Sequence, residues 1–155
     1  MDIRLRPCTP DDQSFLFQLY ADTRRQEVSA FGWDQAQQDA FLRMQFNAQQ
    51  RSYVMAYAGA EHEIILGDDQ PIGRILVLHG ADAKVLVDIA LLANHRGQGT
   101  GGRLLRELIV RGDRERVPVR LQVHRGNPAR RLYERLGFVQ TSEDAMYFQM
   151  ERAPR

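Results

Sequence analysis

The chain has 155 residues, of which 43% are hydrophobic and 26% charged, and its 21 basic and 20 acidic side chains nearly cancel. This composition predicts a single folded domain over residues 1–155 and excludes a disordered chain. No basic run marks a surface for nucleic acid or for anionic lipid, so neither is expected as a partner. No apolar run approaches the ~18 residues of a membrane-spanning helix.

The cysteine and histidine content gives further exclusions. The only cysteine, Cys8, has no internal disulfide partner, and no Cys/His cluster has the spacing of zinc ligands, so no metal site is predicted. The first residues lack the charged and apolar regions of a secretory signal. Together these features predict a cytoplasmic protein.

The first third of the chain predicts one strand and two helices. Residues 3–6 alternate in polarity, and Thr9-Pro10 is typical of a helix start, with an N-cap followed by proline in the first turn. Apolar residues between positions 15 and 20 then share one helical face. After an interruption at residues 31–34, a second amphipathic stretch carries Phe41, Leu42, Met44 and Phe46.

The middle third predicts an antiparallel meander. Short runs rich in β-forming residues occupy residues 53–57, 63–66, 72–78 and 85–92. Asp68-Asp69 lies between two of these runs and indicates a hairpin turn. Residues 85–92 are apolar on both faces except at Asp88, which predicts a buried central strand.

The last third predicts two helices and three strands. A glycine-rich loop at residues 96–102 precedes a helix that ends near Gly112 and a strand at residues 117–123. Asn127 as N-cap and Pro128 in the first position start a second helix, which Gly137 ends. Closing strands are predicted at residues 138–139 and 145–150. The apolar face of the first of these helices consists of Leu104, Leu105, Leu108 and Ile109.

The glycine-rich loop is the most informative segment. Glycines allow successive backbone N–H groups to turn toward one ligand, and a helix start adds partial positive charge, so the loop suits a phosphate or pyrophosphate. A tight turn without a ligand is the alternative.

Two nucleotide-binding motifs fit the loop poorly. Gly97-x-Gly99-x-x-Gly102 matches a dinucleotide fingerprint, but several strands precede it and no acid follows the next strand. The spacing also fits a P-loop, yet Arg103 and Leu104 stand where a P-loop has lysine and serine or threonine.

Two motifs in one order carry a resemblance. Arg96-x-x-Gly99-x-Gly101 follows a buried strand, and after one further strand comes Asn127-Pro-Ala-Arg-Arg-Leu-Tyr-Glu-Arg-Leu-Gly-Phe138. Over about residues 70 to 140 the chain resembles the GCN5-related N-acetyltransferase (GNAT) family. The resemblance implies an α/β acyl-CoA N-acyltransferase fold, in which helices flank a central mixed, mostly antiparallel sheet.

The resemblance also implies a function. It implies transfer of an acetyl group from acetyl-CoA to a small-molecule or peptide amine by direct attack, without an acyl-enzyme and without a metal. A non-catalytic acyl-CoA-binding or regulatory module on the same fold is the alternative. Homodimers are common in this family, so a homodimer is one expected assembly.

Residue roles follow by position in the motifs. Strands 85–92 and 117–123 are expected to part at a bulge and admit the pantetheine arm. The Leu91 N–H is expected to donate to the thioester oxygen, and Tyr133 to act as general acid toward the departing thiolate. Asn127 also fits a helix cap, and Tyr133 a core position. The implied cofactor-binding residues are Ile89, Ala90, Leu91, Arg96, Gly97, Gln98, Gly99, Thr100, Gly101, Gly102, Asn127 and Tyr133.

The general base stays open. Some relatives place a glutamate five positions before the asparagine, but Gln122 stands there and cannot act as a base. Asp88 is the leading candidate, because an acid in an apolar strand needs a partner or a cleft. A salt bridge to an arginine is the equally weighted alternative. His124 shares a strand face with Gln122 but fits a surface histidine better.

The resemblance implies an acceptor pocket between the helical pair and the sheet. The residues expected to shape it are Arg24, Arg25, Glu27, Phe31 and Trp33. A solvated helix end with a hydrophobic plug explains the same residues.

Overall fold

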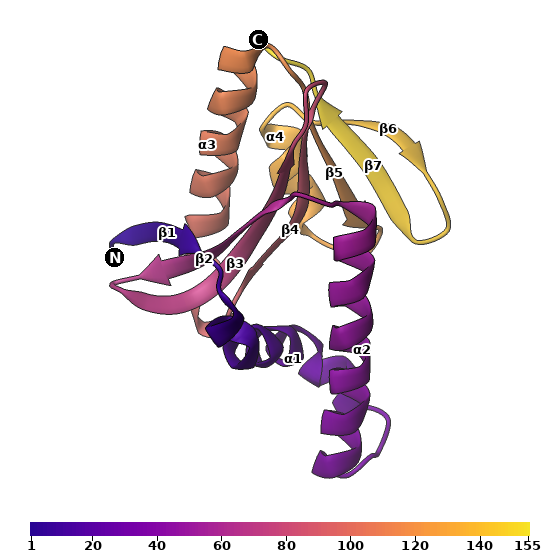
Figure 1. The fold of residues 1–155 in the computed structure, drawn as a ribbon. Coiled ribbons are helices and arrows are strands. Elements are labelled where there is room, and N and C mark those ends of the chain that lie inside the picture. The colour runs from indigo at the N-terminus through magenta and orange to yellow at the C-terminus, as the bar shows by residue number, and fades with distance from the viewer.

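A seven-stranded sheet with the order β1-β2-β3-β4-β5-β7-β6 organises the computed structural model, which describes residues 1–155 (Figure 1). The strands are β1 (Ile3–Pro7), β2 (Glu61–Gly67), β3 (Gln70–His79), β4 (Lys84–Leu91), β5 (Val119–His124), β6 (Val139–Glu143) and β7 (Tyr147–Arg152). The helices are α1 (Gln13–Ser29), α2 (Gln35–Ala56), α3 (Thr100–Glu115) and α4 (Ala129–Arg135), with 3₁₀ turns at Pro10–Asp12 and Ala93–His95. Only β4 and β5 pair in parallel, so the predicted mixed, mostly antiparallel α/β fold is confirmed.

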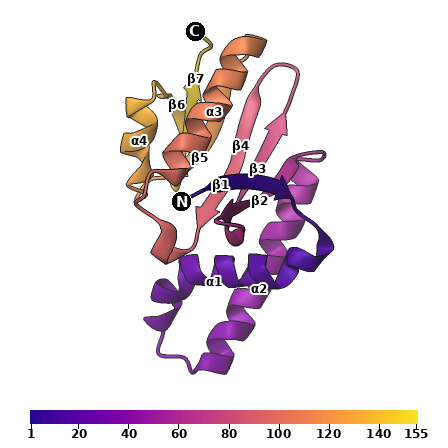
Figure 2. The ribbon, with the colours of Figure 1, turned by 90° about the vertical axis from the view of Figure 1, so that its left-hand side faces the viewer.

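Helices cover both faces of the sheet. The neighbours Ile64 and Ile65 are both fully buried, but Ile64 packs with Leu16 of α1 and Phe46 of α2, whereas Ile65 belongs to the larger core that includes Leu105 of α3. Figures 1 and 2 show α3 on one face and α1 and α2 on the other. None of these helices combines the length and the apolar character of a membrane span.

Local turn signals in the sequence predict the structure well. Asp68 and Asp69 have φ values of 48° and 66°, as the two central residues of a type I′ hairpin require, and they join β2 to β3. Gly137 has a φ of 97° directly after the last turn of α4, which confirms it as the helix stop.

The strand predicted at residues 53–57 is wrong. Residues 53–56 form the last turn of α2, and Tyr57 caps it. Residues of these types favour a strand, but here they continue the helical spacing of the residues before them. The rings of Tyr53 and Tyr57, four positions apart, meet edge-on at 6.4 Å. Further along α2, Met44 is 57% exposed and lies outside the apolar face assigned to it.

The helix end predicted near Gly112 was also misplaced. Helix α3 continues past Gly112 to Glu115 and ends at Arg116, whose φ is 58°. Gly112 is buried inside the helix, and a Cβ there would lie 3.0 Å from the Val117 carbonyl oxygen and 3.1 Å from Val119 Cγ2. Its role is close packing of the helix on the following strand.

The only lysine of the chain is buried. Lys84 begins β4 with 1% of its surface exposed, and its Nζ lies 2.9 Å from a carboxylate oxygen of Glu115 and 3.1 Å from His79 Nδ1. The ion pair lowers the pKa of Glu115. The lysine thus fastens the C-terminal end of α3 to the sheet.

A buried carboxylate fixes the turn between β1 and α1. Arg6 donates to both oxygens of Asp12 at 2.9 and 2.8 Å, and the Thr9 N–H donates to the same carboxylate at 2.9 Å. Chiefly through the Arg6 hydrogen bonds, the pKa of Asp12 falls from 3.8 to about 2.

This lowered pKa predicts an acid-dependent loss of stability. The stabilisation that Asp12 contributes is complete well above pH 3.8 and disappears as the pH falls toward about 2. The reason is that Asp12 of the unfolded chain takes up its proton at a higher pH than Asp12 of the folded protein. We expect Asp12→Asn to lower the free energy of unfolding by on the order of 1 kcal/mol at neutral pH, since the half-exposed Arg6 is screened. Urea denaturation at falling pH should show the difference from wild type vanishing. The exposed neighbour variant Asp11→Asn is the control, and a difference that persists at the lowest pH would contradict the assignment.

Candidate functional site

A gap opens in the sheet where β4 and β5 part. The two strands pair only from Lys84 to Leu86, opposite Val119 to Leu121. The register between β3 and β4 also shifts here, because Leu76 lies opposite Asp88 while Val77 lies opposite Leu86, which leaves Val87 as a bulge. The expected divergence at a bulge is therefore present. Residues 87–91 are half-buried, not fully buried as the apolar pattern predicted, because they have lost one neighbouring strand.

The backbone of β4 offers hydrogen-bonding groups to this gap. The Leu92 N–H donates to the Ile72 carbonyl at 2.8 Å, so the next pair along, Leu91 and Gly73, has its N–H and C=O groups pointing away from each other. The Leu91 groups therefore face the gap, and its carbonyl accepts a hydrogen bond from Arg96 Nε at 2.9 Å. By the same alternation Ile89 also faces the gap, whereas Ala90 faces β3.

The absence of a side chain at Gly73 brings β3 and β4 close together at this point. A Cβ on Gly73 would lie 2.2 Å from the Ala90 carbonyl oxygen and 2.8 Å from Leu91 Cδ2. Only glycine permits this approach, which fixes the position of the strand end that carries the Leu91 amide.

The glycine-rich loop leads from the gap into an uncapped helix. Gly97 and Gly99 have φ values of 73° and 83°, and Gly99 precedes α3 without a side-chain cap. A Cβ at Gly97, Gly99 or Gly101 would meet nothing within 4 Å, so this surface is open. The first N–H groups of the 16-residue helix α3 consequently form a cradle for an anion. Thr100 is buried, and the Gln98 amide donates to the Asn94 carbonyl at 3.2 Å.

Asp22 of α1 fastens the loop from the other side. Its Oδ2 accepts a hydrogen bond from the Ala93 N–H at 2.7 Å and lies 3.4 Å from an Arg96 Nη2. Arg96 therefore links the loop to both β4 and α1. Sequence reasoning did not find Asp22, and no pattern around it distinguishes it from other polar residues on a helix.

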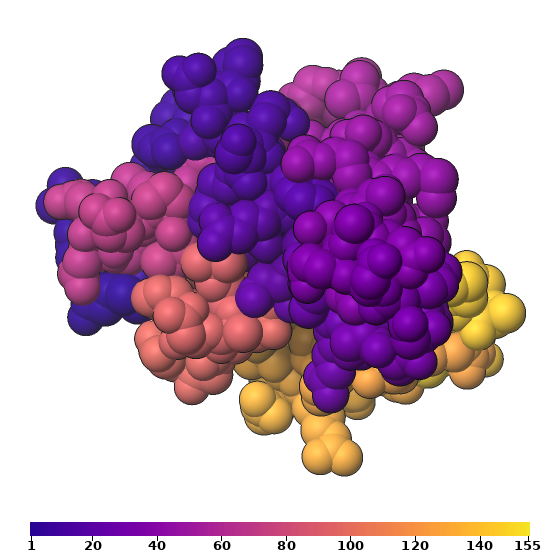
Figure 3. Space-filling model, turned by 90° about the horizontal axis from the view of Figure 1, so that it is seen from below, coloured from indigo at the N-terminus to yellow at the C-terminus, as the bar shows by residue number.

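Helix α4 carries Tyr133, which packs on the same core as Ile89 and Leu91 of β4. Tyr133 packs against the main core, with its ring 5.9 Å from that of Phe138. Burial raises the pKa of Tyr133, and the negative charge of Asp88 raises it further, so the hydroxyl keeps its proton at neutral pH. The charge of Asp88 therefore acts on the Tyr133 hydroxyl from β4. Seen from below, α1, α2, the segment between β4 and α3 and the region of α4 share one face of the molecule (Figure 3).

Asn127 acts as a helix cap. Its Oδ1 accepts a hydrogen bond from the Ala129 N–H at 2.9 Å, and the residue is exposed at the start of α4. This bond is of the N-cap kind, but α4 itself begins at Ala129 with Pro128 before it, one residue later than predicted. The cofactor-binding role of Asn127 stays a prediction.

Asp88 is bound by an arginine. Arg74 Nη2 and Nε donate to Asp88 Oδ2 at 2.7 and 3.1 Å, and the Arg74 side chain is only 5% exposed. Arg74 Nη2 also donates to Gln49 at 3.0 Å, and its guanidinium lies 5.5 Å from the Tyr53 ring centre. The salt-bridge alternative for Asp88 is therefore observed. Both bonds end on Oδ2, which leaves Oδ1 without a protein partner.

Neither of the other two residues considered as the base, Gln122 and His124, has a carboxylate. Gln122 accepts a hydrogen bond from the Gln149 amide at 2.8 Å. His124 Nδ1 accepts one from the Gly126 N–H at 3.2 Å, and the His124 ring meets Tyr147 edge-on at 5.6 Å.

The predicted acceptor-pocket residues gather elsewhere. Phe31 and Trp33 form an edge-on cluster with Phe41 at the turn between α1 and α2. Trp33 precedes α2, whereas Tyr53 lies in its last turn, roughly 27 Å further along the helix axis. Nearby ion pairs join Arg24 to Glu27 and Arg25 to Asp39. The structure does not bring this set together with Asp88 and Tyr133, and its role stays a prediction.

Comparisons with known proteins agree with the fold described above. A family model for the acetyltransferase (GNAT) domain matches residues 51–140. The PaiA N-acetyltransferase from Thermoplasma acidophilum, solved in complex with coenzyme A, superposes with a TM-score of 0.72 at 19% identity over 99% of both chains. An acetyltransferase from Thermus thermophilus gives 0.70 at 16% identity, over 99% of this chain and 97% of that one. These likenesses show the fold. No curated protein sequence matches the chain.

Proposed function

This chain belongs to the GNAT acetyltransferase family, and from that premise we propose that it transfers the acetyl group of acetyl-CoA to an amine acceptor by direct attack. The observation that carries the proposal is the gap between β4 and β5. The Leu91 amide faces it from β4, which also carries Asp88, and the uncapped start of α3 follows it. Tyr133 packs on the same core as Ile89 and Leu91.

The residues present fit acetyl-CoA. The N–H groups of residues 97–102 suit its pyrophosphate, because Gly97, Gly99 and Gly101 carry no Cβ and no other protein atom fills the space beside them. The unpaired edge of Ile89 and Leu91 suits the amides of the pantetheine arm. Acetyl-CoA supplies a thioester, whose carbonyl carbon the neutral amine attacks and whose thiolate leaves.

The chain's own residues account for the charges and protons. The Leu91 N–H donates to the carbonyl oxygen as negative charge develops on it. Asp88 Oδ1, free of protein partners, takes the proton from the acceptor's ammonium directly or through water, while Arg74 holds the carboxylate in place. Tyr133 gives its proton to the departing sulfur. One N–C bond forms and one C–S bond breaks. The attacking nitrogen loses its second proton to water as the amide forms. One of the two protons taken from nitrogen returns through water to Tyr133, and the other is released to solvent.

Acetyl-CoA is expected to raise the melting temperature. At a hundredfold excess over Kd the stabilisation is ~2.7 kcal/mol, which is roughly 5 to 10 °C for a domain of this size. Gly99→Ala should lose most of this shift, because its side chain enters the anion cradle. Gly32→Ala is the matched control, since Gly32 also has a positive φ and open space around it but belongs to the turn between α1 and α2. A shift that Gly99→Ala retains would contradict the assigned pyrophosphate site.

A non-catalytic acyl-CoA-binding module is the second candidate. It is favoured by the Arg74 bonds to Asp88 and by Gln122 at the position where relatives carry a glutamate. Measuring CoA release with a panel of amines separates the two. Release with at least one amine supports the transferase, thermal stabilisation without any release supports the module, and no stabilisation by any CoA thioester contradicts both.

A further inference from the structure

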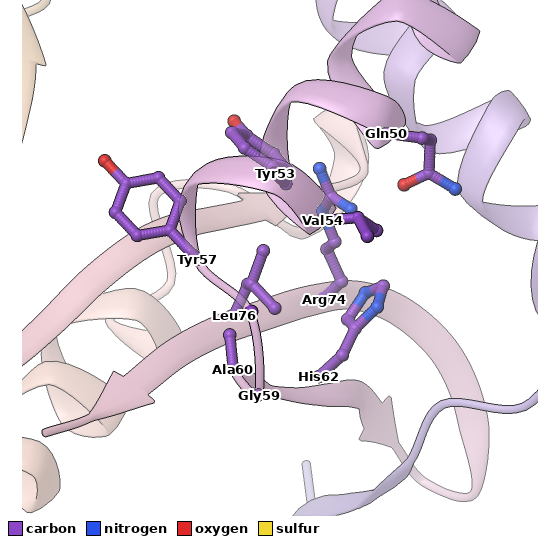
Figure 4. Close-up of a pocket in the computed structure, with 10 residues that line it drawn as sticks. Gln50, Tyr53, Val54, Tyr57, Gly59, Ala60, His62, Arg74 and Leu76 are labelled. Carbon is purple, nitrogen blue, oxygen red and sulfur yellow. The ribbon is translucent and has the colours of Figure 1, made fainter.

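A cavity lies under the C-terminal end of α2. It has a volume of about 320 Å³ and lies between the last turn of α2, the turn at residues 57–60, and strands β2 and β3 (Figure 4). Its apolar walls include Tyr53, Val54, Tyr57 and Leu76. A space of this size suits a small organic molecule. We call it the α2 cavity.

Two of the residues that line the cavity each have a buried side-chain nitrogen without a hydrogen-bond partner. Arg74 uses Nε and Nη2 for Asp88 and Gln49, but its Nη1 is buried and unpartnered, in a side chain that is 5% exposed. His62 also lines the cavity, and its Nε2 is buried and unpartnered as well. Leaving such groups unsatisfied costs about 1 to 3 kcal/mol each, so both favour a ligand that accepts hydrogen bonds.

The charges around the cavity define that ligand further. Burial, and then the charge of Arg74, lowers the pKa of His62 to about 4, so the imidazole is neutral at pH 7 and can donate from Nε2. None of the 10 lining residues is acidic. The lining therefore offers one guanidinium donor and one imidazole donor among aromatic and aliphatic side chains. The carboxylate nearest to Arg74, that of Asp88, is bound to Nε and Nη2 and leaves Nη1 free.

From this arrangement we propose that the α2 cavity binds a small carboxylic acid with an apolar or aromatic body, its carboxylate accepting hydrogen bonds from Arg74 Nη1 and His62 Nε2. This site is separate from the gap between β4 and β5. The two share only Arg74, whose other nitrogens hold Asp88. Its occupancy does not depend on acetyl-CoA or on acyl transfer.

Benzoate titrated into the protein without acetyl-CoA tests the proposal by NMR. We expect saturable shifts of the His62 ring protons and of the Arg74 Nε–H signal, and an upward movement of the His62 titration midpoint, because a bound anion favours the imidazolium. Benzamide, which has the same shape without the charge, should bind at least tenfold more weakly. The titration should give the same result with CoA present.

Paired variants on α2 localise the binding. Val54→Trp should fill the mouth of the cavity and weaken benzoate binding at least tenfold, whereas Met55→Trp, one residue on, is more exposed and does not line it. His62→Phe keeps a ring of similar size and removes the donor, so it should also weaken binding. Absence of saturable shifts, equal affinity for benzamide, or competition by CoA would each overturn the proposal, as would unchanged affinity in a folded Val54→Trp or His62→Phe protein.

Discussion

Replacing Tyr133 with phenylalanine is expected to lower kcat about a hundredfold while leaving the Kd for acetyl-CoA nearly unchanged. The phenol keeps its proton at neutral pH, because burial and the charge of Asp88 both raise its pKa. It can therefore give that proton to a departing thiolate. The ring keeps its packing against Phe138 in the variant, so the cofactor site should stay intact.

A matched tyrosine distinguishes loss of the proton donor from loss of packing. Tyr20 of α1 is also half-buried, and burial raises its pKa, but it packs with Phe46, away from the gap. Tyr20→Phe should keep the wild-type kcat. Steady-state rates of CoA release and calorimetric Kd values give the two readouts. An unchanged kcat in Tyr133→Phe, or an equal fall in affinity for acetyl-CoA, would contradict the general-acid role.

Gly73→Ala is expected to destabilise the protein by about 3 kcal/mol, because the new methyl group would meet backbone atoms of β4. The melting temperature should fall by on the order of 10 °C. Relief of the clash has to push Ala90 and Leu91 away from β3, so we also expect the thermal shift produced by acetyl-CoA to shrink more than the lower stability alone explains.

Gly126→Ala is the control for this substitution. A Cβ at Gly126 would have its nearest contact at 3.7 Å, with His124 Nδ1, and its φ is not positive. This variant should stay within about 1 kcal/mol of wild type. Thermal melts of both variants, with and without acetyl-CoA, provide the comparison. A Gly73→Ala protein as stable as Gly126→Ala would show that the strands can part at this point without cost.

Local signals predicted most of the fold. The Asp68-Asp69 hairpin, the glycine-rich loop and the Gly137 stop each depend on a few adjacent residues whose backbone preferences are strong. Residues 53–57 were assigned wrongly because aromatic and β-branched content favours a strand, whereas their side chains continue the packed face of α2.

The site was predicted less completely because it depends on register. Arg74 meets Asp88 only because β3 and β4 pair with a one-residue shift at Val87. Asp88 was singled out because a charged side chain in an apolar strand needs a partner or a cleft. Arg74 is the only charged residue among residues 72–78, so the same reasoning applies to it. The direction of the Leu91 amide likewise follows from the hydrogen-bond alternation of the pair, which one strand alone does not reveal.

The burial of Lys84 determines which amines of this chain acetyl-CoA can modify. Every other basic side chain except histidine is arginine, whose guanidinium stays protonated and is a poor nucleophile, and the one ε-amine is sealed between Glu115 and His79. The folded protein therefore carries no surface lysine that acetyl-CoA could modify, with or without catalysis. Any acetyl group that becomes covalently attached to an amine of the folded chain must reside on its α-amino terminus.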